Sequence, residues 1–416
     1  MTAIRARRRT FTWVGFVTGL IGVAAVGGLG YAGVENLYDS SAGRRVAADE
    51  PAAPVQRLPY TPTALVATAD EDGWLTTVSV LALAAGGVGG SIVSLSPSGD
   101  AASGNADSLA PLNAVYLVDG ADELLLAGEG LTGMSFDVAE VLDAARFADL
   151  TTPLGELTVE LPTELRDAST GESYPAGVTP MSPDQAGTAI TSRDPSIDDW
   201  LLDPARASIW GAVAEAVGGG VGATSDDPPD TVPASLDEFV ARLFAGPVEH
   251  RSFAFKEISS ERVAEQLGDE YAAAFAEHDD TTVSVVAHDR AELVMVLAAI
   301  APERMGAPFE GPTARVVSRF DSDDLAPLGL NNADVARQAI NRLLFAKVNV
   351  VSFGQTDATP ERTLIEVRDD ADIAGVEAAF GTLFGVADVR VADRLIAGVE
   401  LQITLGRAYL DTVDAP

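Results

Sequence analysis

The pattern of apolar and polar residues between positions 63 and 217 predicts alternating strands and helices. Apolar residues recur at helical spacing over 119–132 and 136–150, which predicts two helices. The glycines of 86–90 fall between two apolar runs and predict a hairpin rather than a phosphate-binding loop, whose lysine is absent. Strands are predicted where β-branched and apolar residues form short runs or alternate with period two, at 64–68, 76–83, 91–95 and 157–161.

Two proline-containing segments predict helix starts. Ser182 precedes a proline and stands three residues before a glutamine, which is the pattern of a capping box. Asp203 precedes Pro204 in the same way, so we expect it to cap a helix predicted at 205–217. The glycine- and proline-rich segment 218–233 then predicts a loop or a domain boundary.

The second half of the chain divides into a mostly helical region and a small α/β domain. Residues 235–305 predict helices with one strand at 282–288, and a helix at 289–300 that ends before Pro302. Beyond residue 312 the order of elements is β-α-β-β-α-β, which predicts a compact two-layer α/β domain over 312–411. Its strands are predicted at 314–319, 348–353, 363–367, 389–392 and 399–405, and its helices at 332–346 and 371–384.

The amino-terminal residues predict a membrane anchor. Residues 10–34 contain no charged side chain, and a segment of this length can form one transmembrane helix. Four arginines in the stub 1–9 and acidic residues after the helix predict a single-pass protein in the cell membrane, with a cytoplasmic N-terminus and an extracellular body. The alternative is a cleaved signal peptide, but the apolar run exceeds the usual 7 to 15 residues of such a segment. A proline-punctuated linker is expected at 35–62.

Composition excludes several classes of protein. The 416 residues contain no cysteine, which excludes disulfide scaffolds, thiolate metal sites and cysteine nucleophiles. The chain has 27 basic and 62 acidic residues and a formal charge of −35, which argues against a nucleic acid partner. Without the four arginines of the stub, 23 basic residues remain against 62 acidic ones, so the predicted extracellular body carries about −39. Anionic lipids would be repelled by a solvated acidic surface of this kind.

Four further segments stand out when they are taken in order along the chain. They are LNAVYLVDGADELLLAGEGLTGMSFD (112–137), AGVTPMSPDQAGTAITSRD (176–194), DPAR (203–206) and GVELQITLGRAYLD (398–411). In this order they resemble the LytR-CpsA-Psr family with a LytR C-terminal domain. The resemblance implies an α-β-α layered domain over 63–305 and a LytR C-terminal-like domain over 312–411. It also implies a membrane-anchored envelope protein that transfers a glycopolymer from polyprenyl pyrophosphate to peptidoglycan, with Mg²⁺ as cofactor.

The sequence departs from this family where charge is needed. Gly73, Trp74 and Leu75 occupy the places of an arginine, a serine and an aspartate that would bind metal. Ser98 replaces another arginine, and Thr191 replaces the first member of an arginine pair. The surviving candidates are Arg193 and Arg206 for phosphate, Asp100 as a catalytic carboxylate and Mg²⁺ ligand, and Asn113 and Asp203 for substrate binding.

Each surviving charged residue also has a structural explanation. Asp100 lies in a serine-glycine turn and can serve the turn alone. Arg193 is expected to form a surface ion pair with its neighbour Asp194. Arg206 lies in the first turn of its helix, where it can bind an anion, extend to solvent or pair with Asp199.

Two functions therefore remain open. The first is a catalytically degenerate binding or scaffold protein in cell-envelope assembly, with no required cofactor. The second is an active glycopolymer phosphotransferase that uses Mg²⁺. Polyprenyl-linked glycan, peptidoglycan or another envelope protein are the expected partners. The test that separates them in a structure is an apolar tunnel between the sheet and the helices of 120–150, with Arg193, Arg206 and Asp100 gathered at its mouth.

Overall fold

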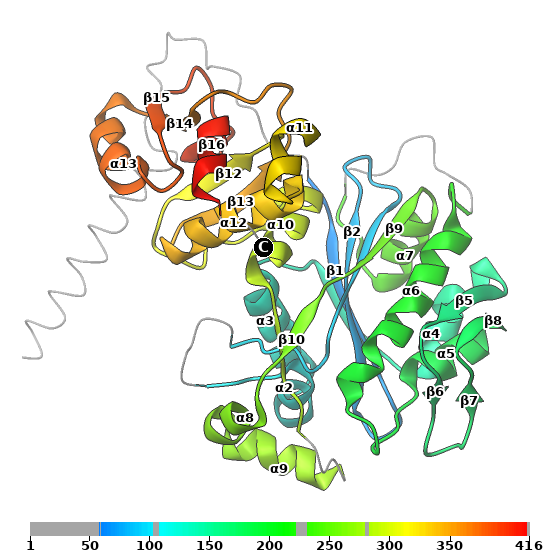
Figure 1. The fold of residues 1–416 in the computed structure, drawn as a ribbon. Helices are drawn as coiled ribbons and strands as arrows, with labels where there is room; N and C mark the ends of the chain where they lie inside the picture. The colour runs from blue at the N-terminus through cyan, green and yellow to red at the C-terminus, as the bar shows by residue number, and fades with distance from the viewer. Residues whose placement is uncertain (1–57, 59, 103–107, 222–230, 279–282, 414–416) are drawn as a thin grey trace, which may run out of the picture. The chain divides into compact units, whose positions relative to one another are not determined.

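The computed structural model describes residues 58, 60–102, 108–221, 231–278 and 283–413. The predicted stub, the predicted anchor at 10–34 and most of the linker lie outside these residues. Among the helices that are described, none has both the length and the apolar character needed to cross a bilayer. The described chain is mixed α/β, as the sequence predicted (Figure 1).

A five-stranded mixed sheet forms the centre of the first part, in the order β4-β1-β2-β3-β9. Its strands β1, β2 and β3 pair antiparallel and match three of the predicted strands, whereas β4 and β9 run parallel to their neighbours. The bounds are Thr63–Ala69 (β1), Leu75–Leu83 (β2), Gly90–Leu95 (β3), Val138–Leu142 (β4) and Val248–Ser252 (β9). The turn between β2 and β3 confirms the predicted hairpin. Gly90 is required there, because a Cβ atom would lie 1.9 Å from the carbonyl oxygen of Ala82.

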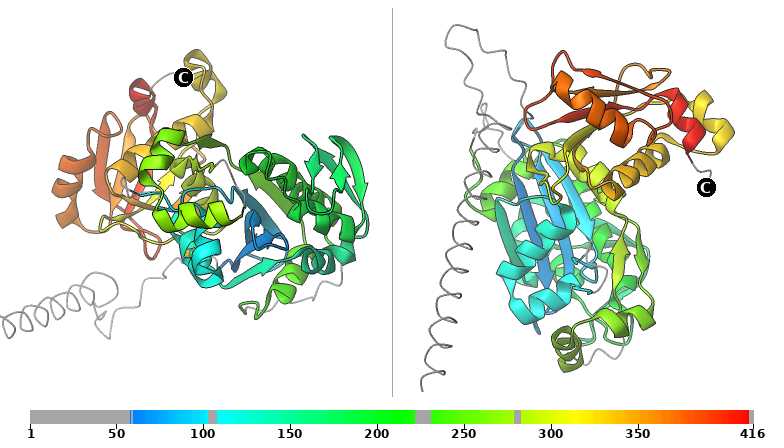
Figure 2. Two further views of the ribbon diagram at one scale, coloured as in Figure 1. Left: turned by 90° about the horizontal axis from the view of Figure 1, so that it is seen from below. Right: turned by 90° about the vertical axis from the view of Figure 1, so that its left-hand side faces the viewer.

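Both faces of this sheet are buried, so helices cover it on each side. Leu65 and Ala67 point toward one core and Ala64 and Val66 toward the other, as the alternation of a strand requires. Figure 2 shows the blue strands between cyan helices on one side and green helices on the other. The first core includes α2 (Leu112–Asp119), α3 (Ala121–Thr132) and α10 (Arg290–Ile300), and the second includes α4 (Ala144–Thr151), α5 (Pro183–Thr191), α6 (Asp203–Val217) and α7 (Leu236–Phe244).

The prediction of a single helix over 136–150 is wrong. The segment divides into the strand β4 and the helix α4, because Asp143 ends the strand and caps the helix by accepting a hydrogen bond from the Arg146 amide at 2.7 Å. Apolar residues spaced for a helix thus fall partly on a strand that pairs with β1. The helix predicted at 119–132 is confirmed as α3, and α2 precedes it across Gly120, whose φ of 84° suits glycine.

The region 235–305 contains more strand than predicted. Besides β9, the strand β10 (Phe255–Glu257) pairs with β11 (Val286–His288), which is the carboxyl end of the strand predicted at 282–288. The helices α8 (Ser260–Gln266) and α9 (Asp269–Glu277) lie between them. The predicted helix at 289–300 is confirmed as α10, with Asp289 as its cap.

Two small ladders flank α5. The predicted strand β5 (Leu157–Leu161) pairs with β8 (Gly177–Met181), and β6 (Leu165–Arg166) pairs with β7 (Ser173–Tyr174). The capping box at α5 is confirmed: the Gln185 amide donates to Ser182 Oγ at 3.3 Å, and the Ser182 amide donates to Gln185 Oε1 at 3.0 Å. These bonds fix the start of the helix that leads to Arg193.

A second five-stranded sheet, in the order β13-β12-β16-β14-β15, forms the carboxy-terminal part. Its core is separate from the two around the first sheet and includes Leu401 and Ile403, which alternate with less buried polar residues as predicted. The helix predicted at 371–384 is shorter than expected. The bounds are Thr313–Val317 (β12), Ser322–Leu325 (α11), Asn332–Phe345 (α12), Asn349–Gly354 (β13), Thr363–Val367 (β14), Ile373–Phe380 (α13), Ala387–Val391 (β15) and Leu401–Thr404 (β16).

A partly buried ion pair holds the first residues of β1. The Asp137 carboxylate accepts hydrogen bonds from the Thr63 amide, at 3.0 Å, and from Arg304, which also lies over the ring of Tyr60 at 4.6 Å. The Thr63 hydroxyl donates to the carbonyl of Ser135 at 2.8 Å. We call these contacts the β1 clasp; they tie the start of the strand to the loop before β4 and to Arg304.

Candidate functional site

Three threonines lie where the sheet ends beside the loop between α5 and α6. Thr68 Oγ1 is 2.8 Å from the hydroxyl of Thr76 and 2.8 Å from that of Thr77, and all three side chains are buried. These hydroxyls satisfy one another's hydrogen-bonding capacity. The start of β2, where the resemblance implies a charged motif, therefore carries neutral groups bonded among themselves.

Asp70 orients Trp74 in the turn between β1 and β2. Asp70 Oδ1 accepts hydrogen bonds from the amides of Trp74, at 2.7 Å, and Asp72, at 3.0 Å. Burial raises the pKa of Asp70, although the Trp74 amide and the nearby Arg193 oppose this shift. The indole of Trp74 is buried and packs against Phe275 of α9 with ring centroids 5.4 Å apart. A large apolar ring thus fills the place of the expected metal-binding residues.

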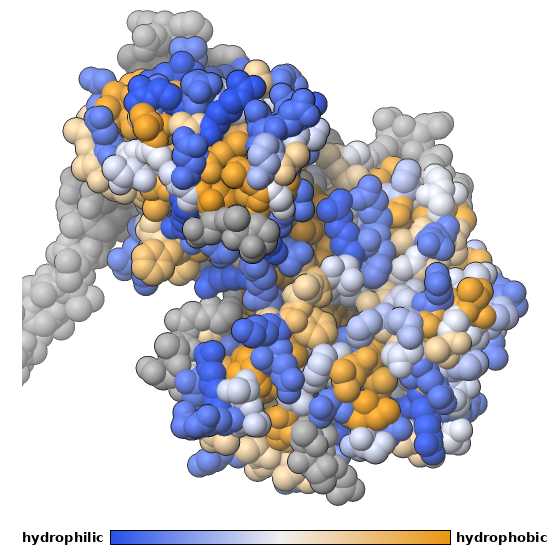
Figure 3. Space-filling model, in the orientation of Figure 1, coloured by the Kyte–Doolittle hydropathy of each residue, from blue (hydrophilic) through white to orange (hydrophobic). Residues whose placement is uncertain are grey.

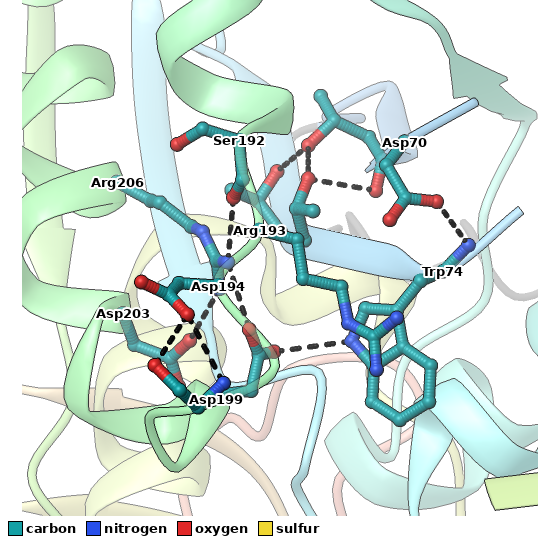
Figure 4. A network of polar contacts seen from close by, with 12 residues as sticks. Asp70, Trp74, Ser192, Arg193, Asp194, Asp199, Asp203 and Arg206 are labelled. Carbon is teal, nitrogen blue, oxygen red and sulfur yellow. Dashed lines mark hydrogen bonds and ion pairs between the residues drawn. The ribbon is translucent and has the colours of Figure 1, made fainter. Parts of the chain in front are cut away.

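Arg193 lies flat against this tryptophan. Its guanidinium carbon is 3.9 Å from the centre of the Trp74 ring, and its Nη2 donates to the carbonyl of His278 at 3.3 Å (Figure 4). The predicted surface ion pair with Asp194 is wrong, because Arg193 is buried and Asp194 accepts instead from the amide and hydroxyl of Ser196. Those hydrogen bonds lower the pKa of Asp194. Arg193 therefore stabilises the Trp74 cluster by a cation–π contact.

Arg206 is completely buried and bound to groups of the chain itself. Its Nη2 donates to the carbonyl of Ser192 at 2.8 Å and to Asp199 Oδ1 at 2.7 Å. The pairing with Asp199, one of the three alternatives for this arginine, is confirmed. Asp199 Oδ2 also accepts from Trp74 Nε1 at 3.4 Å, so a single carboxylate joins the two arginine environments (Figure 4).

Asp203 is not the helix cap that the sequence predicted. Leu202 occupies the capping position, and Asp203 is the first residue of α6, with a buried side chain. Among the described residues its two carboxylate oxygens accept no hydrogen bond, and Oδ1 is 3.7 Å from Arg206 Nη1. Burial, and then the charge of Asp199, raise the pKa of Asp203 well above its usual range, against the opposing charge of Arg206. Burial therefore favours the protonated form of Asp203 beside the Asp199–Arg206 pair.

Asp100 and Asn113 have local partners. Asp100 Oδ1 accepts from the amides of Ala102, at 3.0 Å, and Ala110, at 2.9 Å, which confirms the turn explanation. Asn113 is buried in the first turn of α2, and its Oδ1 accepts from the next amide at 2.9 Å. The structure thus joins Arg193 to Arg206 through Trp74 and Asp199, but it gives Asp100 separate partners. Among the described residues, no group of three histidines, aspartates or glutamates is arranged to hold a metal ion.

Two cavities bear on binding. A cavity of about 10 Å³ beside Asp203 and Arg206 is the size of one water site, and it is also lined by Thr76, Thr77, Ser94, Leu95 and Ala207. A larger pocket of about 220 Å³ lies between α3 and the strands β1 and β4. Neither candidate arginine nor Asp100 lines this larger pocket. The three residues named in the test are therefore not gathered at its mouth.

His288 is partly buried near the same end of the sheet. Its Nε2 accepts from the amide of Ser96 at 3.3 Å, and its ring packs edge-on against Phe253 and Phe255. Burial lowers its pKa to about 4. His250, which bonds Ser94 Oγ at 3.0 Å, has its pKa lowered by burial to about 4 as well. Both imidazoles are therefore neutral at physiological pH.

Sequence reasoning missed the roles of Trp74 and Asp199. Trp74 was noticed only as a departure from a motif, and Asp199 only as one partner among several for Arg206. A buried tryptophan needs an acceptor for its Nε1 hydrogen, and this requirement was the available signal. The acceptor lies 125 positions away, however, so spacing along the chain could not identify it.

No protein-family model and no curated protein matches the chain. Weak similarities exist to solved structures. One is a protein from Eubacterium siraeum that is named a putative transcription regulator. It is 13% identical with a TM-score of 0.36, over 58% of this chain and 100% of its own. TagV of B. subtilis is 13% identical with a TM-score of 0.35, over 54% of this chain and 100% of its own. TagT bound to LIIa-WTA is 10% identical with a TM-score of 0.35, over 57% of this chain and 98% of its own. These values are too low to assign a family or an activity to the chain.

Proposed function

We propose that the protein is a membrane-anchored binding or scaffold protein of the cell envelope, built on a LytR-CpsA-Psr-like fold without that family's phosphotransferase activity. The observation that carries this proposal is the engagement of both candidate phosphate-binding arginines inside the protein. Arg206 is fully buried and paired with Asp199, and Arg193 is stacked on Trp74. The envelope location rests on the apolar segment 10–34 of the sequence.

A pyrophosphate would have to compete with Asp199 for Arg206. Separating a buried ion pair costs about 3–5 kcal/mol, because one charge is left buried without its partner. Asp199 would also repel the incoming phosphates, since its carboxylate lies 2.7 Å from Arg206. This end of the sheet thus supports an internal structural network better than an anionic substrate.

The larger pocket is also unfavourable for a long lipid carrier. Its volume of about 220 Å³ is below the roughly 300–1,000 Å³ of pockets that enclose ordinary small ligands. Much of the length of a polyprenyl chain would therefore remain outside the pocket. We therefore propose that partners bind the surface of the protein. Peptidoglycan, polyprenyl-linked glycan and other envelope proteins are the candidates.

Hydrolysis of a soluble carrier analogue tests the proposal. The full chain, purified in detergent with Mg²⁺, should release no phosphate from geranylgeranyl pyrophosphate. Phosphate release that persists in Arg251→Ala but disappears in Arg206→Ala would overturn the proposal and establish the phosphotransferase alternative. Arg251 is the matched control because it is exposed on β9 and its ion pair among the described residues is with Glu249. Circular dichroism of each variant shows whether a lost signal reflects lost folding.

A further inference from the structure

A pocket of about 220 Å³ lies between α3 and the first sheet. On the face shown in Figure 3, apolar side chains form separate groups among hydrophilic ones, so a concave pocket is the better place to look for a ligand. Its walls come from three elements, α3, β1 and β4. The lining residues are Leu65, Ala67, Ala121, Asp122, Leu124, Leu125, Ala139, Glu140 and Val141.

The charge of the pocket is negative. None of its lining residues is basic. Asp122 lies in the first turn of α3, is exposed, and makes no hydrogen bond or ion pair with another described residue. Glu140 contributes little charge to the pocket, because alternation along β4 turns its side chain to the opposite face. There it accepts a hydrogen bond from Arg146 Nε at 2.8 Å. Asp122 is thus the carboxylate available to a bound ligand.

We propose that this pocket binds a cationic amphiphile, with an alkyl group between α3 and the sheet and a positively charged head beside Asp122. The apolar walls shield the alkyl group from water, and the Asp122 carboxylate at the rim favours a head group with a positive charge. An anionic head would meet Asp122 and a protein whose net charge is −35. This inference does not depend on the proposed envelope function, because it uses neither Arg193 nor Arg206.

The size of the pocket limits the length of the alkyl group. A volume of about 220 Å³ corresponds to about seven water-sized volumes, and a methylene group is of similar size. Each methylene that enters an apolar site should raise affinity about fourfold. Affinity should therefore rise along a homologous series and level off at about seven carbons, once the pocket is filled.

Calorimetric titration of the full chain in zwitterionic nanodiscs tests the proposal, with empty nanodiscs subtracted. The probes are n-alkyltrimethylammonium ions of four to ten carbons and alkyl phosphates and alkyl glucosides of the same lengths. We expect the ammonium series to bind most tightly, the glucosides less and the phosphates least. Equal or tighter binding of the phosphates, or no binding of the ammonium series, would refute the inference.

Two variants locate the binding. Asp122→Asn should weaken ammonium binding by about two- to fivefold and leave the glucosides unchanged, because an exposed charge pair is worth little more than that. Glu123→Gln is the matched control, since Glu123 lies in the same helical turn but does not line the pocket. Ala139→Leu should fill the pocket and shorten the chain length at which affinity levels off. Unchanged binding in both Asp122→Asn and Ala139→Leu would place the amphiphile elsewhere and overturn the assignment.

Discussion

Asp199 Oδ1 lies 2.7 Å from Arg206 Nη2, in a pair whose arginine is completely buried. The second oxygen of the same carboxylate accepts from the indole of Trp74 at 3.4 Å. The network therefore connects the start of α6 to the start of β2. Positive charge that the sequence left available for a phosphate is neutralised within the protein.

Asp199→Asn should lower the free energy of unfolding by about 3–5 kcal/mol, because Arg206 would keep its buried charge and lose its partner. Urea unfolding followed by circular dichroism measures this loss. Asp198→Asn is the control, since Asp198 is adjacent and its side chain makes no capping hydrogen bond. It should change stability by no more than about 0.5 kcal/mol. Equal effects of the two substitutions would show that the Asp199–Arg206 pair adds nothing to stability.

Asp203→Asn should stabilise the protein increasingly as pH rises. The native state holds the proton of Asp203 more tightly than the unfolded state, where the pKa is near 3.8. The contribution of Asp203 is therefore fully present below pH 3.8 and is lost as pH rises through the higher native value. Unfolding of wild type and variant at several pH values from 3.5 to 8 measures the difference. A difference that stays constant with pH would mean that Asp203 is ionised in the native state.

His288→Gln should remove part of the acid sensitivity of the protein. Because the native pKa is about 4 and the ordinary pKa of histidine is 6.5, the unfolded state takes up the proton first as pH falls. Stability is thus lost between pH 6.5 and 4, by about 3 kcal/mol for this group. His250 should contribute in the same direction. The double variant should flatten the profile further, and an unchanged profile in both variants would contradict the buried, neutral state of the two rings.

The stacking of Arg193 on Trp74 should appear as a coupling energy. In a double-mutant cycle with Arg193→Gln and Trp74→Leu, we expect about 0.5–2 kcal/mol of coupling in unfolding experiments. Trp74→Leu alone should be more costly than Arg193→Gln, because it also leaves a cavity beside Phe275 and removes the Nε1 donor. A coupling energy near zero would mean that the two side chains are neighbours without mutual attraction.

The sequence allowed correct prediction of strands whose own residues favour a strand. β1, β2 and β3 consist of β-branched and apolar residues, because both faces of the sheet are buried. β4 was misassigned because Val138, Val141 and Leu142 also fit helical spacing, and the cap at Asp143 decides between the two. β9 has the sequence VEHRS, which is mostly polar, so its pairing with β3 had no local signal.

For the candidate site, sequence identified the residues but not their contacts. Arg193, Arg206 and Asp203 do lie at one end of the sheet, on the loop and helix where the pattern placed them. Their partners come from the turn before β2, from the residue after α9 and from the loop before α6, and contacts between distant segments leave no periodic trace in the chain. The complete burial of Arg206 has no local signal either.

The β1 clasp has a mechanical consequence. If residues 10–34 anchor the chain, any pull between the membrane and a bound partner enters the body through β1. Thr63 is held by Asp137 and Ser135, and β1 is bonded along its length to β4 and β2. Tension along the strand would act in shear on ladders whose bonds lie across it, so many bonds resist together. The Asp137–Arg304 pair would bear load first, and this attachment is suited to a tethered protein under strain.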